Sequence, residues 1–389
     1  MSALHIAPTP FFSNRGCHIR IRNEIEALKS FKVRIILCTY HHGQSVSGID
    51  IRRIFKIPGY TKTDVGYSSF KFIADFFLFF LALKTTWKER PVILHGHLHE
   101  GALLGWMIKR ILFWRKIPLV MDMQGSLAGE LEAYKTFQSF PFVLNIFSWI
   151  EQLICWLPDH FICSSENSQS LLENRFGISR SKIVVVRDVV PSIFFSRQNP
   201  DSWKKKYRIP KDKRVILYAG SLLPGKGIHH VLEAMRILSG EYEDLFFILA
   251  GYPKKDVESY VQMHGLKENS YLPGEIQYES LPAWLSTADI ALEPKFNDSG
   301  EASGKLIHYM TAGLPIVCYD FPINRAILGD AGYFANPGSI HDFIHEIKKA
   351  LADARMSQQK GAKSRARAED NYSLKNAGIK LKMIYDALQ

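Results

Sequence analysis

The sequence predicts an α/β protein built on parallel β-sheets, and three observations carry this prediction. Apolar runs of strand length, such as 215–220 and 246–251, alternate with segments of helical periodicity such as 228–238. This alternation of strand and helix recurs along the chain, as it does in βαβ units. Glycine-bearing loops, such as 221–227, separate a strand from the helix that follows it. In parallel sheets such loops lie at the carboxyl ends of the strands, where ligands bind.

The chain is expected to divide into two domains of this kind and a terminal helix. The first domain spans residues 1–190, the second spans 191–369, and the terminal helix spans 370–389. A segment rich in charge and proline, 192–213, is expected to link the two domains. Strands of the first domain are expected at 2–6, 32–38, 92–94, 119–121, 160–163 and 183–186.

Composition indicates a globular protein of a reducing compartment. The 389 residues are 47% apolar and 22% charged, which suits two domains with sizeable cores. Five cysteines are widely spaced and form no CxxC pair, a pattern typical of buried thiols. The opening residues, Met-Ser-Ala-Leu-His-Ile, have neither the basic start nor the apolar centre of a signal peptide. We therefore expect a cytoplasmic location.

The net charge of +11 is concentrated in the first half of the chain. Residues 1–190 hold 23 Lys and Arg against 15 Asp and Glu, or +8, and the remainder holds 26 against 23, or +3. Segments 73–87, 104–116 and 137–157 are rich in Phe, Trp, Leu and Ile, and the second adds four cations, as interfacial helices do. Peripheral membrane contact and ordinary core helices both remain open as explanations. No nucleic-acid-binding motif accompanies the charge, so nucleic acid is not expected as a partner.

Two loop-to-helix junctions have the character of phosphate sites. Residues 300–315 form a small-residue loop that runs into a helix stopped by Gly313 and Pro315. The second junction, 221–227, places Lys226 at the turn before a helix. Backbone N–H groups and the helix dipole at such junctions favour phosphates and sugar hydroxyls. An ordinary loop before a helix is the alternative for each.

Taken in order, these motifs resemble the retaining glycosyltransferases of the GT-B fold, specifically the group 1 family, which is family 4 of the carbohydrate-enzyme classification. Lys226 in Gly-Lys-Gly looks like the family lysine that holds the donor diphosphate. Residues 288–294 resemble the family's "AD(I/V)…P" strand, and 305–315 resemble its "KLxEYMAAGxP" helix. The Gly16 loop and a His-x-His near residue 97 extend the resemblance over essentially the whole chain.

The resemblance implies two Rossmann-like domains that face a central cleft, with the C-terminal helix crossing back to the first domain. It also implies metal-independent, retaining transfer of a sugar from a nucleotide-diphosphate sugar to a glycan or lipid-linked acceptor. Such a reaction would serve cell-surface polysaccharide or glycolipid biosynthesis. No cofactor is expected, and the donor would be a UDP-sugar or a GDP-sugar.

The resemblance also assigns roles to residues of this chain. Those expected in catalysis are His97, Lys226 and Glu301. Those expected to bind the donor are Gly16, Gly220, Ser221, Lys226, Gly274, Glu301, Ala302, Ser303, Gly304, Lys305 and His308. Those expected on the acceptor side are Asp122, Gln124 and Gly125. No metal ligand is expected.

Two departures from the family pattern motivate a second hypothesis. His308 stands where the family usually has Glu, and the paired upstream Glu falls at Gly300, one residue from Glu301. Ser221 stands where the family usually has an Arg. The alternative function is therefore a binding or scaffold protein that keeps the GT-B fold without catalysis.

A third hypothesis, a metal hydrolase, rests on His95, His97 and His99. Alternate residues of a strand share a face, so three imidazoles in this pattern can ligate a metal. No Asp, Glu or Cys cluster with ligand spacing supports them, which favours histidines that are only hydrogen-bonded.

Overall fold

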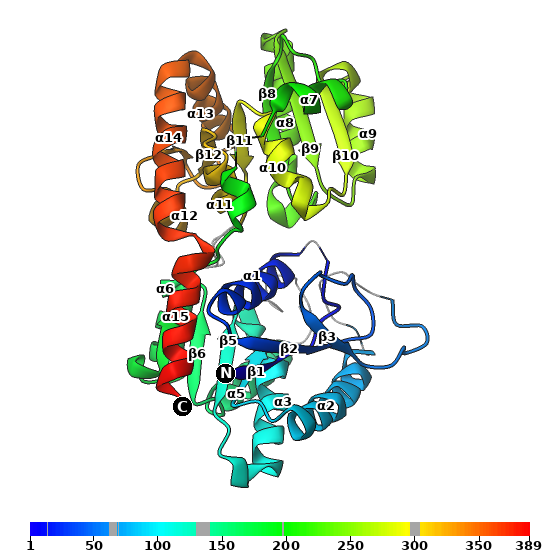
Figure 1. Ribbon diagram of the computed structural model, residues 1–389. Helices are drawn as coiled ribbons and strands as arrows, with labels where there is room; N and C mark the ends of the chain where they lie inside the picture. The colour runs from blue at the N-terminus through cyan, green and yellow to red at the C-terminus, as the bar shows by residue number, and fades with distance from the viewer. Residues whose placement is uncertain (14, 62–67, 69, 130–140, 197, 296–303) are drawn as a thin grey trace. The chain divides into compact units, whose positions relative to one another are not determined.

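The computed structural model describes the chain except residues 14, 62–67, 69, 130–140, 197 and 296–303. The chain forms two compact units (Figure 1). Unit 1 comprises Met1–Val189 and Leu374–Gln389, and unit 2 comprises the described chain between them. None of the helices that the structure describes combines the length and the apolar character that crossing a bilayer requires.

Unit 1 contains a seven-stranded sheet of order β3-β2-β1-β4-β5-β6-β7, in which every neighbouring pair is parallel. Its strands are β1 Ser2–Ala7, β2 Arg34–Thr39, β3 Asp50–Arg53, β4 Ile93–His97, β5 Leu119–Met123, β6 His160–Cys163 and β7 Ile183–Val185. The short edge strand β3 was not expected, because its sequence Asp-Ile-Arg-Arg carries one apolar side chain. Strand β4 runs three residues beyond the expected 92–94 and so includes both His95 and His97.

Helices cover both faces of this sheet, and the alternation of side chains along β1 shows which helix covers which face. Ala3 and Ala7 belong to the core formed with α1 Gly16–Ser30 and α15 Leu374–Ala387. Leu4 and Ile6 belong to the core formed with α2 Phe70–Glu89 and α3 Leu98–Ile111. The layer of α2 and α3 continues with α5 Pro141–Cys155 and α6 Glu166–Asn174. Two short 3-10 turns complete unit 1, η1 Phe113–Arg115 and η2 Arg180–Lys182.

Unit 2 contains a six-stranded parallel sheet of order β10-β9-β8-β11-β12-β13. Its strands are β8 Arg214–Ala219, β9 Leu245–Ala250, β10 Ser270–Gly274, β11 Ile290–Glu293, β12 Ile316–Tyr319 and β13 Gly332–Ala335. Its helices are α7 Pro200–Lys206, α8 Ile228–Glu241, α9 Lys255–Met263, α10 Leu281–Ser286, α11 Gly304–Thr311, α12 Pro322–Leu328, α13 Ile340–Ala352 and α14 Ala354–Asn371. Four 3-10 turns lie between them, η3 Ser192–Phe195, η4 Pro224–Lys226, η5 Lys267–Asn269 and η6 Tyr278–Ser280.

The segment expected as a linker, 192–213, is instead an ordered part of unit 2. It contains η3 and α7. The rings of Trp203 and Tyr207 lie 5.7 and 4.4 Å from the ring of Trp284 in α10. Aromatic packing of this kind outweighs the charge and proline content that suggested a linker.

The end of the chain consists of two helices in different units. α14 ends at Asn371 in unit 2, and α15 begins at Leu374 in unit 1. Within unit 1, α15 packs against α1 and buries Leu381, Ile384 and Tyr385. The last helix therefore completes the core of the first unit.

Candidate functional site

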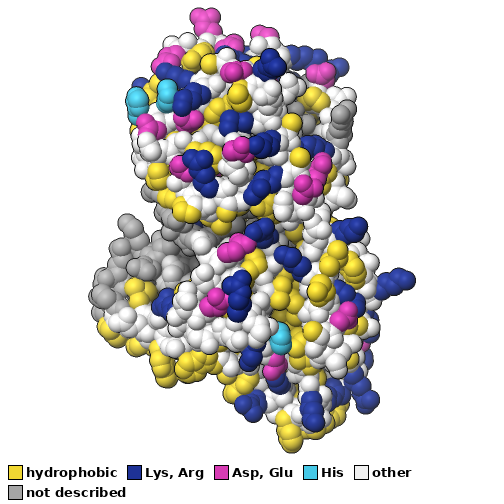
Figure 2. Space-filling view, turned by 90° about the vertical axis from the view of Figure 1, so that its left-hand side faces the viewer, with side chains coloured by type: hydrophobic (Ala, Val, Ile, Leu, Met, Phe, Trp, Pro, Cys, Tyr) yellow, Lys and Arg dark blue, Asp and Glu magenta, His cyan; other side chains and the backbone are white. Residues whose placement is uncertain are grey.

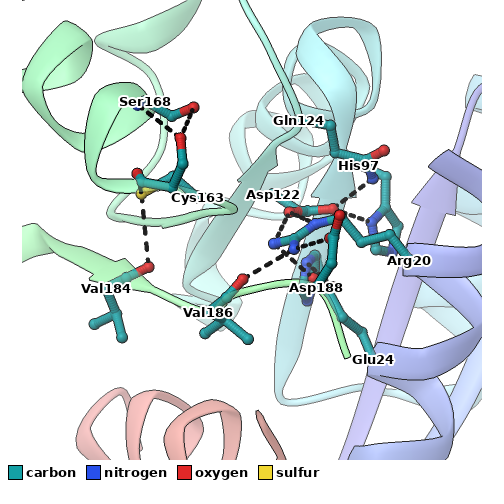
Figure 3. A network of polar contacts seen from close by, with 12 residues as sticks. Arg20, Glu24, His97, Asp122, Gln124, Cys163, Ser168, Val184, Val186 and Asp188 are labelled. Carbon is teal, nitrogen blue, oxygen red and sulfur yellow. Dashed lines mark hydrogen bonds and ion pairs between the residues drawn. The ribbon is translucent and has the colours of Figure 1, made fainter. Parts of the chain in front are cut away.

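In unit 1, polar side chains from three adjacent strands meet on the face covered by α1 and α15. His5 of β1 lies opposite His95 of β4, and His97 lies opposite Asp122 of β5. All four side chains are fully buried. They are joined there by Arg20 and Glu24 of α1 and by Tyr385 of α15 (Figure 3 shows most of this network).

The histidines and Tyr385 form a continuous chain of hydrogen bonds. His97 Nδ1 lies 3.0 Å from Asp122 Oδ2, and His97 Nε2 lies 2.9 Å from His5 Nδ1. The Tyr385 hydroxyl lies 3.0 Å from His5 Nε2 and 2.8 Å from His95 Nδ1. Burial lowers the pKa of His5 and of His95 well below the ordinary value, so both rings are neutral.

When all three rings are neutral, the protons of this chain have a consistent arrangement. His97 Nδ1–H donates to the Asp122 carboxylate, and His97 Nε2 accepts from His5 Nδ1–H. His5 Nε2 then accepts from the Tyr385 hydroxyl, whose oxygen accepts from His95 Nδ1–H. Both ring nitrogens of His97 thus have protein partners. This assignment of tautomers follows from the hydrogen-bond network.

Arg20 is the charged centre of the same network. Its Nε and Nη2 lie 3.0 and 2.8 Å from Asp122 Oδ1, and its Nη1 lies 2.9 Å from Asp188 Oδ1 (Figure 3). Burial disfavours the charge on Asp122, but Arg20 and the hydrogen bond from His97 outweigh it and lower the pKa of Asp122. Glu24 lies 2.9 Å from Arg20 Nη2, yet burial and the nearby Asp122 raise the pKa of Glu24 well above its usual range. One cation therefore faces several carboxyl groups, and Asp122 holds the negative charge.

The structure separates the three histidines of the metal hypothesis. His99 lies in α3, which covers the opposite face of the sheet, and its Nε2 lies 3.3 Å from Glu151 Oε1. His5, and not His99, is the third histidine that lies close to His95 and His97. The carboxyl groups of Glu24 and Asp122 also lie near His95 and His97. The Arg20 guanidinium already binds Asp122 and Glu24 in this cluster, so a metal cation would have to displace it. The described residues fit an internal hydrogen-bond network better than a metal site.

The remaining predicted residues of unit 1 lie at the ends of strands and helices. Gln124 and Gly125 follow β5, and Gln124 Nε2 donates to Asp122 Oδ2 at 2.6 Å. Gly16 begins α1, where a Cβ would meet no protein atom within 4 Å. Packing against the described residues does not demand a glycine at this position.

In unit 2, the strand, loop and helix expected at 215–238 are β8, η4 and α8. Gly220 and Ser221 follow β8, and Lys226 lies in η4 with its side chain half-buried. Gly227 has a φ of 79°, and a Cβ there would lie 2.0 Å from the carbonyl oxygen of Pro294. Only glycine fits this turn, which brings the loop of Lys226 against the end of β11.

Three glycines lie next to one another at the carboxyl ends of β8, β9 and β10. Gly220 N–H donates to Ala250 at 2.9 Å, and Gly251 N–H donates to Gly274 at 2.8 Å. A Cβ on Gly251 would lie 1.7 Å from the carbonyl oxygen of Gly220. Gly220 and Gly274 were among the predicted site residues, but Gly251 was not, although it directly follows the apolar run 245–250. The result is a stretch of backbone without side chains at three neighbouring strand ends.

Lys305 at the start of α11 adds a fixed cation beside this stretch. Its Nζ lies 2.9 Å from Glu293 Oε2 and 4.6 Å from the centre of the Tyr218 ring. Burial disfavours its charge, but Glu293 outweighs this effect and raises the pKa of Lys305. A Cβ on Gly220 would lie 2.8 Å from Lys305 Cδ, so the two residues are in direct contact. Glu293, which holds Lys305 in place, was not among the predicted site residues.

His308 is packed inside unit 2. Its Nε2 lies 3.1 Å from the Tyr278 hydroxyl, its ring lies 4.8 Å from Phe194, and its side chain also bonds the Gly304 backbone. Burial lowers the pKa of His308 to about 4, so the ring is neutral at pH 7. These contacts hold His308 within the packing of unit 2. The predicted residues Glu301, Ala302 and Ser303 lie outside the described residues.

Two parallel-sheet units of this kind define the GT-B fold, and comparisons with known proteins give the family. The model named "Glycosyl transferases group 1" matches residues 199–368, and the model named "Glycosyltransferase Family 4" matches residues 15–191. Together they cover most of the chain, which belongs to the group 1 glycosyltransferases.

Individual relatives are distant. Over 179 residues the chain is 24% identical to alpha-D-kanosaminyltransferase of Streptomyces kanamyceticus, covering 45% of this chain and 46% of that protein. Over 211 residues it is 27% identical to the GPI3 subunit of phosphatidylinositol N-acetylglucosaminyltransferase of Saccharomyces cerevisiae, covering 52% and 46%. The matches thus span about half the length of these curated relatives. The solved structure of Anabaena HepE in complex with UDP-glucose shares the fold, with a TM-score of 0.77, 13% identity and 100% of both chains covered.

Proposed function

We propose that this protein transfers a glycosyl group from a nucleotide-diphosphate sugar to a glycan or lipid-linked acceptor. The observation that carries the proposal is the glycine-lined end of the unit 2 sheet, flanked by Lys226 and Lys305. The glycines add no side chains at this end of the sheet, and the cations would stabilise the charge that develops on a diphosphate as the sugar departs. The starts of α8 and α11 add the positive ends of two helix dipoles.

In this mechanism Lys226 neutralises the leaving diphosphate, and Lys305, held by Glu293, supports the same region. We propose that transfer needs no metal or cofactor, because these groups provide the positive charge. Retention of the anomeric configuration is proposed from the family resemblance, with Glu301 orienting the sugar. A UDP-sugar or GDP-sugar is the proposed donor, and the UDP-glucose complex of the structurally similar Anabaena protein supports the former.

Unit 1 is proposed to supply the acceptor side through Asp122, Gln124 and Gly125. Gln124 is half-buried at the end of β5 and is fixed by Asp122, so it can present its amide to an acceptor hydroxyl. His97 is assigned a positioning role, because both of its ring nitrogens bind protein atoms and it holds Asp122 in turn. Cell-surface polysaccharide or glycolipid synthesis at the cytoplasmic face of a membrane is the proposed setting.

Binding without catalysis is the second candidate, and His308 favours it. A buried neutral imidazole stands where the family usually has a carboxylate, and Tyr278 already occupies its Nε2.

A donor screen separates the two candidates. The purified protein is heated with UDP, GDP, ADP or CMP, because a ligand that binds the native state raises the melting temperature. Nucleoside diphosphate release is then measured with the matching sugar donors and a panel of glycan and lipid acceptors. Binding with release supports the transferase, and binding without release from any donor supports the scaffold. No binding of any nucleotide would contradict the proposed donor site.

A further inference from the structure

The outer helix layer of unit 1 exposes aromatic side chains where an α/β protein ordinarily exposes polar ones. On α2, Phe76, Phe80 and Trp87 are 59, 50 and 60% exposed. On α5, Ile146 and Trp149 are 49 and 61% exposed. Their spacings of three, four and seven residues put the side chains of each helix on a single stripe. These stripes point away from the sheet, because the opposite sides of α2 and α5 form the core.

The stripe of α2 continues onto the turn that follows α3. α3 packs against both α2 and α5, and η1 follows it directly. In η1, Phe113 and Trp114 are 72 and 55% exposed, and the ring of Trp114 lies 6.4 Å from the ring of Trp87. We call the outer faces of α2, η1 and α5 the aromatic face. Figure 2 shows exposed hydrophobic side chains along the lower end of unit 1, with Lys and Arg side chains beside them.

The segment that contains α2, α3 and η1 carries an excess of positive charge. Residues 70–116 contain eight Lys and Arg against three Asp and Glu. Each of the three acids has a protein partner: Asp75 accepts from Tyr40, Glu89 pairs with Arg34 and Arg52, and Glu100 pairs with Lys71. Among the cations, Lys84, Lys88, Arg110 and Lys116 are exposed. Arg115 lies over the Trp87 ring at 5.4 Å, so cation and aromatic are intermixed.

We propose that the aromatic face docks on the surface of an anionic lipid bilayer. Exposed Phe and Trp rings would enter the interfacial region, while the cations beside them would contact anionic headgroups. Charge argues against a second copy of the chain as the occupant. A symmetric dimer through this face would set one excess of cations against another. The docking needs no turnover, so it stands apart from the proposed transfer reaction.

Vesicle binding tests the docking directly. The full chain is sedimented with vesicles of phosphatidylcholine alone or of phosphatidylcholine and phosphatidylglycerol in equal parts, and Trp fluorescence is recorded. We expect binding to the anionic vesicles with a blue shift, and binding at least about tenfold weaker to phosphatidylcholine. Phe113→Ser with Trp114→Ser should weaken anionic binding about tenfold, since two rings leave the interface. Lys88→Glu with Lys116→Glu should remove the preference for anionic vesicles.

Exposed residues of unit 2 provide the matched control. Met263, which is 78% exposed, and Lys211 are changed together as Met263→Ser with Lys211→Glu. This variant should bind as the unchanged protein does, and circular dichroism checks that every variant is folded. The proposal is overturned if folded protein ignores anionic vesicles, binds both vesicles equally, or binds as well after either double substitution on the aromatic face. A dimer in solution that Phe113→Ser with Trp114→Ser dissociates would assign this face to a second copy instead.

Discussion

The two sheets share a parallel architecture but use their strand ends differently. In unit 1, β1, β4 and β5 carry histidines and a carboxylate on one face, and these side chains bind each other and the helices α1 and α15. In unit 2 the ends of β8, β9 and β10 carry glycines with a lysine beside them. One sheet uses polar side chains on its strands to hold its own helices. The other ends in closely packed glycines beside Lys305, in the region where a phosphate is expected.

The substitution with the largest expected effect, Lys305→Met, tests whether Lys305 also stabilises the fold of unit 2. Lys305→Met leaves the Glu293 carboxylate, 1% exposed, without its cation, and should lower the free energy of unfolding by about 3 kcal/mol. Urea denaturation measures the loss. The double variant Lys305→Met with Glu293→Gln should regain most of it, because the unpaired charge is gone. Equal stability of the single variant and the unchanged protein would contradict the ion pair.

Lys226→Ala should act on catalysis alone. Removing one group that stabilises developing charge costs about a hundredfold in rate, equivalent to about 2.7 kcal/mol. The half-buried side chain of Lys226 contributes little to stability, so the melting temperature should change little. Lys211→Ala, on the surface of the same unit, is the matched control. Unchanged nucleoside diphosphate release by Lys226→Ala would remove this lysine from the donor site.

Tyr385→Phe tests the hydrogen-bond network of unit 1. The change leaves His5 Nε2 and His95 Nδ1 without their partner and should cost about 2 kcal/mol, since each buried group left unpaired costs at least about 1 kcal/mol. Urea denaturation should show the destabilisation. Tyr333→Phe is the comparison in unit 2, because this tyrosine makes a hydrogen bond at 2.8 Å to Ser357. If Tyr385→Phe cost no more than Tyr333→Phe, the network would not tie α15 to the sheet.

The pH dependence of His308 should be the smallest effect. Its pKa is lowered from about 6.5 to about 4 in the folded state. The folded state therefore takes up the proton of His308 at a lower pH than the unfolded state does. Its contribution to stability is complete above pH 6.5 and is lost as the pH falls toward 4. Between pH 7 and pH 5 the loss should be about 2 kcal/mol. His308→Gln should show a correspondingly smaller pH dependence in urea denaturation, and an equal dependence would contradict the assignment.

The sequence predicted the local helices and strands better than it predicted the contacts between distant parts of the chain. Strands such as 160–163 and the junction around Lys226 were predicted because apolar runs and glycine turns are local signals. The short strand β3 and the helix α7 were missed, since an edge strand and a helix held by Trp203 and Tyr207 depend on distant contacts. The pattern His95, His97, His99 suggested one cluster because the end of β4 could not be seen in the sequence. The change from strand to helix at Leu98 takes His99 to the other face.

By itself, the sequence determined the α/β class, the strand, turn and helix around Lys226, and the helix that contains Lys305. Those features follow from periodicity and from residues whose backbone preferences are local. Only the tertiary structure decided that Tyr385 would join His5 and His95, that Arg20 would reach Asp122, and that Glu293 would hold Lys305. The first three pairs lie 380, 290 and 102 residues apart in the chain, and sheet order and helix packing bring them together. Burial then shifts their pKa values, which no local pattern records.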